Sequence, residues 1–216
     1  MTSGAIKVLL VDDHAVVRAG FQMLLSQSED IDVIAEAQRG EEACRYYADL
    51  NPDVVVMDLS MPGIGGLACI RRIRSRDPGA RVLVFSIHDE RVYVTRAFEA
   101  GARGYITKNS APDMLTEAVR RIFAGETFLE AGIAERLTAQ SFTDGGGALS
   151  VSALSAREFD VFCLLAKGYT TREVAEELRL GYKTAGNYRT QIKHKLGVNT
   201  SAEMTRLAYA HGILKS

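Results

Sequence analysis

The sequence predicts an α/β domain built on a central parallel sheet, followed by a smaller all-α domain. Five short β-branched runs alternate with helical stretches up to residue 125, a glycine run follows, and three helix-start signatures lie beyond it. The chain has 216 residues, of which 47% are hydrophobic and 25% charged, and these proportions suit one or two globular domains.

The formal net charge of −1 hides an asymmetry between the two ends of the chain. Residues 1–150 hold 16 basic and 21 acidic residues, a charge of −5. The remaining residues hold 10 basic and 6 acidic ones, a charge of +4. An acidic front and a basic back indicate two domains with different partners.

Membrane, secreted and zinc-binding classes of protein do not fit the sequence. No apolar run approaches the roughly 18 residues that span a bilayer, and the first ten residues lack the pattern of a signal peptide. The cysteines, Cys44, Cys69 and Cys163, are widely spaced without a CxxC pair, so each is expected to be a small buried hydrophobe. We expect a cytoplasmic protein.

The periodicity places the elements of the first domain, residues 1–125. Strands are expected at Ile6–Val11, Val33–Ala37, Val54–Asp58, Val82–Ser86 and Gly104–Thr107. Helices are expected at Val16–Ser26, Glu41–Leu50, Leu67–Arg76, Arg91–Ala100 and Asp113–Ala124. The third strand is apolar throughout, as expected of a central strand that is buried on both faces.

Residues 126–150 predict a linker, and residues 151–216 predict a helical domain. The linker holds a short helix at Ala131–Gln140 and a flexible run at Gly145–Gly147. Three capping boxes, each a Ser or Thr followed three residues later by Glu, occur at Ser155/Glu158, Thr170/Glu173 and Thr200/Glu203. A fourth helix runs from Tyr182 to Leu196 and ends at Gly197. The short connection before it suits a helix-turn-helix.

Polar side chains follow the predicted strands where the strands end: Asp12 and Asp13, Asp58, Ser86, and Thr107 with Lys108. The carboxyl ends of parallel strands meet at one edge of a sheet, so these groups are expected to converge. Three crowded carboxylates need a cation, and an all-oxygen site with few protein ligands suits Mg²⁺. A metal, a lysine, a hydroxyl and a free carboxylate are the parts needed for phosphoryl transfer to that carboxylate. Asp58 is the best candidate for the nucleophile.

Each of these residues also has a plain structural interpretation. Asp13 could cap the next helix, Ser86 and Lys108 could be an ordinary strand-end hydroxyl and a solvated charge, and Tyr105 could be a core residue. Their joint occurrence at successive strand ends favours a site.

The first domain resembles the receiver domains of bacterial two-component response regulators over residues 5–125. The resemblance rests on Val11-Asp12-Asp13-His14, Met57 to Gly63, Ser86, and Gly104 to Lys108. It implies a flavodoxin-like (βα)5 fold in which Asp58 accepts a phosphoryl group from a phosphohistidine of a sensor histidine kinase. It further implies a Mg²⁺ ion held by Asp13, Asp58 and the Ser60 backbone carbonyl, with Asp12 acting through water. Lys108 would offset phosphoryl charge, while Ser86 and Tyr105 would move as a switch.

The tail resembles the four-helix LuxR-type helix-turn-helix domain of the NarL/FixJ branch over residues 152–214. The matching residues include Leu154 to Glu158, Leu165 to Gly168, Arg172 to Ala175, Lys183-Thr184, Ile192 and Lys195 to Val198. The predicted helix at 182–196 has a basic face and an apolar face, as a helix entering a major groove should. DNA contacts are expected from Lys183, Thr184, Asn187, Arg189, Thr190, Lys193 and Lys195.

The recognition helix departs from the family pattern at Ala185, Gly186 and Tyr188, and the tyrosine is similar to that of the GacA/BvgA-type global regulators. Gly186 costs about 1 kcal/mol of helix propensity relative to alanine and removes a side chain where many members reach DNA. Base contacts would then come from Asn187 and Thr190, and phosphate contacts from Arg189 and the lysines. In the last helix, Leu207, Ala208 and Ile213 could form a dimer seam or pack in the core.

The resulting prediction is a phosphorylation-controlled transcription factor and not a turnover enzyme. The resemblance implies a sensor histidine kinase, double-stranded DNA and, after phosphorylation, a second copy of the chain as partners, with RNA polymerase as a further candidate and no membrane. One alternative is a haloacid-dehalogenase-like phosphatase, although its DxD motif after the first strand is missing. The other is an interaction protein whose tail binds DNA weakly, and Gly186 is its support.

Overall fold

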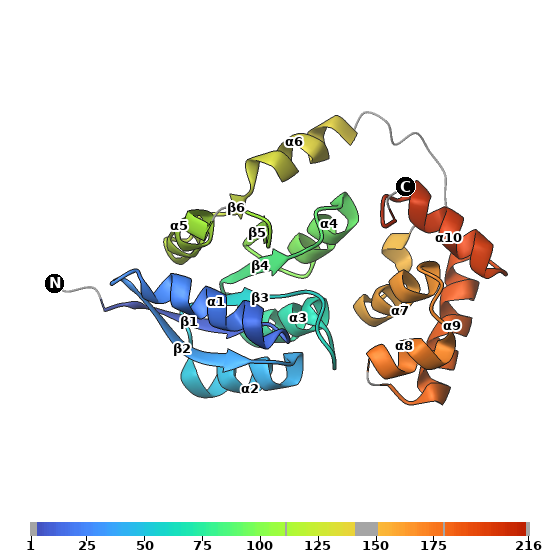
Figure 1. The fold of residues 1–216 in the computed structure, drawn as a ribbon, viewed down its shortest axis with the longest axis horizontal. Helices are drawn as coiled ribbons and strands as arrows, with labels where there is room; N and C mark the ends of the chain where they lie inside the picture. Colours follow the sequence, from blue (N-terminus) through green and yellow to red (C-terminus); the bar gives the residue numbers. More distant parts are fainter. Residues whose placement is uncertain (1–3, 111, 141–150, 179, 215–216) are drawn as a thin grey trace. The chain divides into compact units, whose positions relative to one another are not determined.

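The computed structural model describes residues 4–110, 112–140, 151–178 and 180–214 (Figure 1). The chain divides into two compact units: residues 1–89 and 93–135, and residues 136–216 with the segment 90–92. The predicted Gly145–Gly147 run lies outside the described residues. No helix among the residues that the structure describes has the length and apolar character needed to cross a bilayer.

The first unit is built on a parallel sheet with the strand order β2-β1-β3-β4-β5-β6 (Figure 1). Its strands are β1 Ile6–Val11, β2 Ile31–Ala37, β3 Val54–Met57, β4 Val82–Ser86, β5 Gly104–Thr107 and β6 Phe128–Leu129. The five predicted strands and the parallel sheet are confirmed, with β2 beginning two residues earlier than expected. The order reverses between β1 and β3, which is where ligands gather in sheets of this kind.

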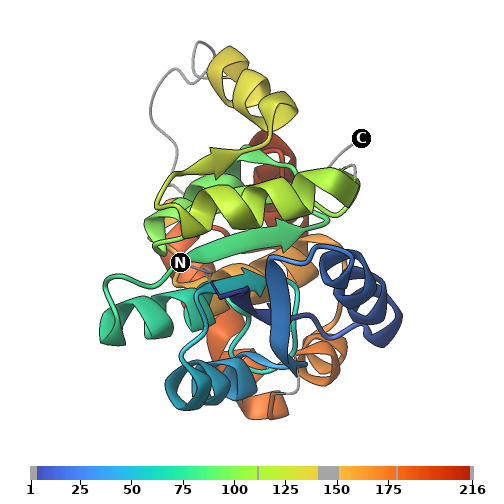
Figure 2. The same cartoon turned by 90° about the vertical axis from the view of Figure 1, so that its left-hand side faces the viewer.

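Helices cover both faces of this sheet. They are α1 Ala15–Ser26, α2 Gly40–Leu50, α3 Gly66–Arg76, α4 Arg91–Glu99 and α5 Pro112–Phe123. Helix α1 packs with α5, and α2 packs with α3, while Figure 2 shows α1 and α2 on opposite sides of the sheet. The predicted helices are confirmed, since their apolar residues recur at the spacing that places them on one face.

The core of the first unit lies between the sheet and helices α1 and α5. Leu10, Val56, Leu83 and Ile122 belong to one cluster of buried side chains there. All four residues of β3 are at most 1% exposed, so the central strand is buried on both faces, as predicted. Burial contributes about 1.5–3 kcal/mol for each such side chain, which holds the strand ends in fixed positions.

Strand β6 was not predicted, and it pairs with β5 within the stretch expected to be a linker. A strand of two residues is too short for a recognisable period, and its pairing with β5 is a tertiary contact. Phe128 in β6 is buried against the sheet. The following helix, α6 Ala131–Gln140, has the predicted bounds.

The second unit contains α7 Ala156–Ala166, α8 Thr171–Glu177, α9 Tyr182–Leu196 and α10 Ser201–Ala210, preceded by a 3-10 turn at Val151–Ala153. All three predicted capping boxes are present: each Ser or Thr side chain accepts a hydrogen bond from the backbone of its Glu, and each Glu accepts one in return. Gly197 ends α9 with φ +60°, the left-handed conformation that glycine adopts easily.

Packing of the last helix favours the core interpretation over the dimer seam. Ala208 and Ile213 are at most 5% exposed within the chain itself, and Leu207 is half-buried. Helix α10 packs against α7. Ala208 and Ile213 are therefore already covered in a single copy, whereas Leu207 keeps part of its surface exposed.

Candidate functional site: an acidic cluster at the strand ends

The carboxylates that follow β1 and β3 lie side by side. Val11 pairs with Met57 in register, and the Asp58 backbone N–H donates to the Val11 carbonyl over 2.9 Å. Ligand atoms of Asp12, Asp13, His14 and Asp58 all lie within 4.8 Å of one another. The expected convergence of the strand ends therefore holds for these residues.

Lys108 joins the two buried carboxylates. Its Nζ lies 2.6 Å from Asp12 Oδ2 and 2.8 Å from Asp58 Oδ2, and all three side chains are less than a tenth exposed. Its backbone N–H donates to the Ser86 carbonyl over 2.8 Å, which ties the loop after β5 to the end of β4. The lysine therefore stands where a charge added to Asp58 would need compensation.

Burial and charge shift the pKa values at this site. Burial raises the pKa of Asp58, and Asp12 adds to the rise, while Lys108 opposes it. For Lys108, burial favours the neutral amine, but the charges and hydrogen bonds of Asp58 and Asp12 outweigh it and raise the pKa. The cluster therefore holds more negative than positive charge in little water, and a further cation would relieve the repulsion.

The donor set fits a hard divalent cation. Asp13 Oδ1 is buried and accepts no hydrogen bond within the described part of the chain, although His14 Nδ1 lies 2.9 Å away. Helix α1 is capped by His14 without a side-chain hydrogen bond, so Asp13 does not serve as its cap. A buried carboxylate oxygen beside two other carboxylates is a ligand arrangement that Mg²⁺ uses. The acidic cluster can therefore bind Mg²⁺.

Arg18, which the sequence analysis did not single out, fixes the end of β1. Its Nη1 donates to the Asp12 carbonyl over 2.7 Å, and its Nε lies 2.6 Å from Glu36 Oε2. The side chain is 9% exposed although it carries a full charge. Arg18 could have been noticed in the sequence, because it is a charged residue on the side of an amphipathic helix that faces the sheet.

Ser86 and Tyr105 lie beneath a loop residue, His88, that the sequence analysis also missed. The buried Ser86 Oγ accepts from the His88 backbone N–H over 3.3 Å, and the Tyr105 hydroxyl donates to the His88 carbonyl over 2.7 Å. The imidazole lies 3.0 Å from Ser60 Oγ through Nε2 and stacks on Tyr93 with ring centroids 3.9 Å apart. One residue thus connects the two proposed switch side chains to the loop that follows Asp58.

Ser60 itself lies next to the carboxylate, because its backbone N–H donates to Asp58 Oδ1 over 3.3 Å. The loop then turns through Gly63 and Gly65, which have φ values of +87° and +72°. At Gly66 a Cβ atom would stand 2.2 Å from the Asp58 carbonyl oxygen. Helix α3 therefore begins directly against the backbone of Asp58, and only glycine allows this approach.

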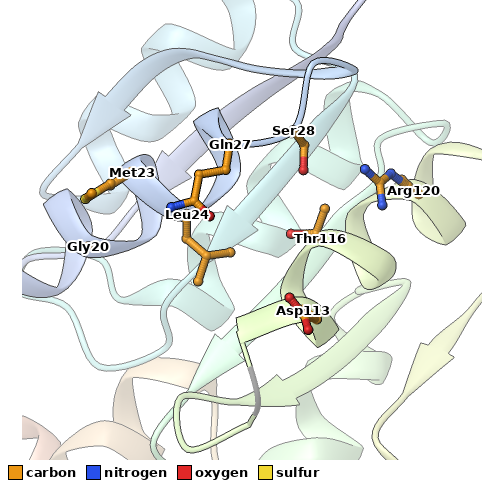
Figure 3. Close-up of a pocket in the computed structure, with 8 residues that line it drawn as sticks. All are labelled: Gly20, Met23, Leu24, Gln27, Ser28, Asp113, Thr116 and Arg120. Carbon is orange, nitrogen blue, oxygen red and sulfur yellow. The ribbon is translucent and has the colours of Figure 1, made fainter.

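A cavity of about 640 Å³ lies elsewhere in this unit, between α1 and α5 (Figure 3). Leu24 and Met23 line it from α1, and Thr116 and Arg120 line it from α5. It contains none of the clustered carboxylates. The acidic site is thus recognised by its charges and distances and not by the volume of a cavity.

Helix α9 presents a polar face in the second unit. Lys183, Thr184, Asn187 and Thr190 are exposed, whereas Ala185, Ile192 and Leu196 are buried. A Cβ atom at Gly186 would meet nothing within 4 Å, so no packing contact requires the glycine. Exposed polar groups on one side of the second helix of a helix-turn-helix are placed to reach base edges and phosphates.

Three basic side chains of the predicted DNA-binding set make contacts within the domain. Arg189 Nη1 donates to Thr171 Oγ1 of α8 over 3.2 Å, and Lys193 Nζ donates to the Asn199 carbonyl. Lys195 Nζ lies 2.7 Å from the buried Glu158 carboxylate, the acid of the first capping box. Arg189 and Lys195 thus join α9 to α8 and α7, and Lys193 holds the loop after α9. The exposed residues of α9 outside these contacts are the more available for DNA.

Comparison with known proteins assigns both units. Residues 8–120 match the response regulator receiver domain, and residues 152–208 match the bacterial regulatory proteins of the luxR family. The chain is 42% identical over 209 residues to the transcriptional activator protein ExaE of Pseudomonas putida, covering 96% of this chain and 98% of that protein. It is 35% identical over 209 residues to the response regulator GacA of Pseudomonas aeruginosa, covering 97% and 98%.

A crystal structure shows a similar fold over about two thirds of this chain. The two-component response regulator of the LuxR family from Aurantimonas sp. SI85-9A1 is 41% identical in sequence to this chain, with a TM-score of 0.62. The match covers 65% of this chain and 99% of the Aurantimonas chain. The matched families span both the sheet domain with its acidic cluster and the helix-turn-helix, and they exclude the phosphatase alternative. The chain belongs to the two-component response regulators of the NarL/FixJ type, which join a receiver domain to a LuxR-type DNA-binding domain.

Proposed function

We propose that a sensor histidine kinase phosphorylates Asp58 and that this step controls dimerisation and sequence-specific DNA binding in the cytoplasm. The contact of Lys108 with both Asp12 and Asp58, at the edge where three carboxylates meet, is the observation that carries the proposal. The receiver, residues 1–125, would receive the signal, and residues 151–216 would bind DNA. RNA polymerase is a further candidate partner.

In the proposed reaction an Asp58 oxygen attacks the phosphorus of a phosphohistidine, forming an O–P bond as the N–P bond breaks. The Lys108 ammonium, held by two buried carboxylates, would compensate the charge that the phosphoryl group brings. Asp13, Asp58 and the Ser60 carbonyl would hold Mg²⁺, with Asp12 acting through water. When bound, Mg²⁺ neutralises negative charge on the phosphoryl oxygens. The same site would catalyse autophosphorylation and dephosphorylation.

Ser86 and Tyr105 form the proposed switch. A phosphoryl oxygen would recruit the Ser86 hydroxyl, which now accepts from the His88 backbone. Because the Tyr105 hydroxyl is bound to the carbonyl of that same residue, movement at one position would be transmitted to the other. Such coupling would shift a two-state receiver toward the form that dimerises.

Size-exclusion chromatography with and without an acyl phosphate tests this function. The treated protein is expected to elute as a dimer and to bind promoter DNA more tightly than the untreated pool. The same treatment of the Asp58→Asn variant is the control and should leave it unchanged. Identical elution and DNA affinity of the two wild-type pools would contradict phosphorylation control. An absence of enriched sites in a genome-wide DNA pull-down would favour the interaction-protein alternative.

Mg²⁺ is expected to stabilise the receiver through the acidic cluster. At a concentration about ten times the dissociation constant, binding to the folded state alone adds about 1.4 kcal/mol to the free energy of unfolding. Thermal unfolding of protein freed of metal by EDTA, with and without Mg²⁺, measures the effect. The Asp13→Asn variant lacks one ligand, so Mg²⁺ should raise its free energy of unfolding by much less than that of wild type. An equal increase in stability in both proteins would show that Asp13 is not a Mg²⁺ ligand.

Alanine substitutions of Lys195 and Lys183 are expected to have different effects. The first should lower stability, and the second should weaken DNA binding. Lys195→Ala leaves the buried Glu158 carboxylate without its cation and should cost about 1–2 kcal/mol in thermal unfolding, since the lysine is partly exposed. Lys183→Ala should change stability by less than about 0.5 kcal/mol, but should reduce the salt dependence of DNA binding by about one phosphate contact.

The pH dependence of stability provides a second test of the Lys195–Glu158 ion pair. Burial opposes the charge of Glu158, but the hydrogen bonds of Lys195 and Ser155 outweigh it and lower the pKa of the carboxyl. A lowered pKa in the folded state stabilises the protein above the unfolded pKa, and this stability is lost as the pH falls through the folded pKa. The difference between wild type and Lys195→Ala should therefore shrink at acidic pH. A difference independent of pH would mean that the ion pair is not its cause.

A further inference from the structure

Two of the three cysteines meet in the receiver although they lie 25 positions apart. Cys44 on α2 and Cys69 on α3 place their sulfur atoms 3.5 Å from one another. Both are free thiols, 6% and 0% exposed, whereas Cys163 lies on α7 of the other unit. The spacing of the cysteines in the sequence does not indicate this contact, and each was expected to be a small buried hydrophobe.

The two thiols have different surroundings. Cys44 lines a cavity of about 280 Å³, which Arg72 and Arg76 of α3 also line. Cys69 does not reach the cavity and donates from Sγ to the Gly40 carbonyl over 3.3 Å. A small molecule in the cavity therefore meets Cys44 first, with Cys69 directly behind it.

The charges around the pair favour ionisation of the outer thiol. When Cys44 is ionised, the Cys69 S–H can turn from the Gly40 carbonyl to the Cys44 sulfur, 3.5 Å away. This contact and the charges of Arg72 and Arg76 lower the pKa of Cys44, against the effects of burial and of Glu41. The pKa of Cys69 is raised by its contact with Cys44 and by burial. Asp77 and Tyr47 also line the cavity and bind one another, with 2.5 Å between the Tyr47 hydroxyl and Asp77 Oδ2. Thiolates and not thiols react with peroxides, so the two cysteines differ in reactivity.

We propose that Cys44 and Cys69 are a hydroperoxide-reactive pair, in which Cys44 is the site of oxidation and Cys69 the resolving thiol. The product is a disulfide between α2 and α3. The proposal does not depend on the phosphorylation of Asp58.

The chemistry needs only the two thiols and a hydroperoxide. The Cys44 thiolate attacks the terminal oxygen, an S–O bond forms and the O–O bond breaks, so that Cys44 becomes a sulfenic acid. The leaving alkoxide or hydroxide takes up the proton that the Cys44 thiol released on ionising and departs as an alcohol or water. The Cys69 sulfur then attacks the Cys44 sulfur, and the S–O bond breaks. The Cys69 proton leaves with the hydroxyl group as water. Two thiols lose two electrons in all, and the hydroperoxide gains them.

The geometry permits this bond after a small movement. A disulfide requires sulfur atoms about 2.05 Å apart, so the two atoms must approach by about 1.5 Å from their 3.5 Å separation. The closed ring of residues 44–69 contains β3, Asp58 and the loop through Gly63 and Gly65. Oxidation would therefore tie together the two helices that flank the chain segment carrying the acidic site.

Treatment of the whole chain with hydrogen peroxide tests the proposal. Intact mass should fall by about 2 Da, and thiols counted after denaturation should fall from the three of the reduced chain to a single one. Peptide mapping should give one cross-link, between Cys44 and Cys69. The Cys163→Ser variant is the matched control and should form the same cross-link at the same rate.

Single variants distinguish the two roles. Cys69→Ser should stop at a sulfenic acid on Cys44 that dimedone traps, whereas Cys44→Ser should leave Cys69 unreacted at the same peroxide dose. Alkylation of Cys44 in the Cys163→Ser background should follow a pH profile whose midpoint lies below that of an ordinary cysteine thiol, because the pKa of Cys44 is lowered. Oxidation that begins at Cys163 or Cys69, cross-links between chains, or intact thiols in folded wild type at doses that oxidise a free cysteine would each overturn the proposal. Circular dichroism of each variant establishes that it is folded.

Discussion

Replacing Asp58 with asparagine is expected to abolish phosphorylation by an acyl phosphate or a histidine kinase. The amide retains the size of the side chain but has no anionic oxygen to attack phosphorus. Incorporation should fall to background, a loss of at least about 100-fold, as expected when a nucleophile is removed. Radiolabelled phosphodonor or intact mass measures it.

The asparagine variant should fold, because Lys108 keeps Asp12 as a partner 2.6 Å away. The raised pKa of Asp58 supports this expectation. A folded-state pKa above the unfolded value stabilises the protein at low pH, and that contribution is lost as the pH rises through the folded pKa. Ionisation of the buried carboxyl is thus less favourable in the folded protein than in the unfolded chain, and the amide of the variant does not ionise. Asp53→Asn, at an aspartate before β3, is the matched control, and equal phosphorylation of wild type and Asp58→Asn would reject Asp58 as the acceptor.

Gly66→Ala should be the most damaging small substitution in the receiver. Its Cβ would stand 2.2 Å from the Asp58 carbonyl oxygen and 2.7 Å from the Leu59 Cα. Backbone atoms cannot rotate away as the end of a side chain can, so either α3 or the loop after β3 must move. Overpacking of this kind costs about 3 kcal/mol, which lowers the melting temperature of a unit of this size by roughly 10 °C. Because the loop carries Asp58, phosphorylation should slow as well.

Gly20→Ala in α1 is the matched control for this substitution. A Cβ atom at Gly20 meets nothing within 4 Å, and the residue lies inside an exposed stretch of helix. Alanine should therefore raise stability by about 0.5–1 kcal/mol through helix propensity. Calorimetry of both variants separates a specific clash from a general effect of adding a methyl group. If Gly66→Ala melts at or above the wild-type temperature, helix α3 does not depend on this close approach.

Most of the secondary structure could be predicted because it depends on neighbours along the chain. The apolar period identified all five main strands and the helices between them, and the capping boxes marked three helix starts that the structure confirms. The acidic cluster could be predicted for a related reason. Parallel strands bring their carboxyl ends to one edge, so Asp12 and Asp58 had to converge once the sheet was recognised.

The remaining features depend on contacts between segments far apart in sequence and become visible in the folded chain alone. His88 contacts Ser60, Ser86 and Tyr105 because of the course of the loop after β4. Lys195 on α9 contacts Glu158 on α7 because the two helices pack together. The pairing of Cys44 with Cys69 follows from how α2 packs on α3. The helices, the strands and the convergence of polar side chains at the strand ends could be predicted from the sequence, because they follow from local periodicity and from the geometry of a parallel sheet. The tertiary structure determined which side chains touch, because that depends on the packing of helices and loops, which local pattern does not specify.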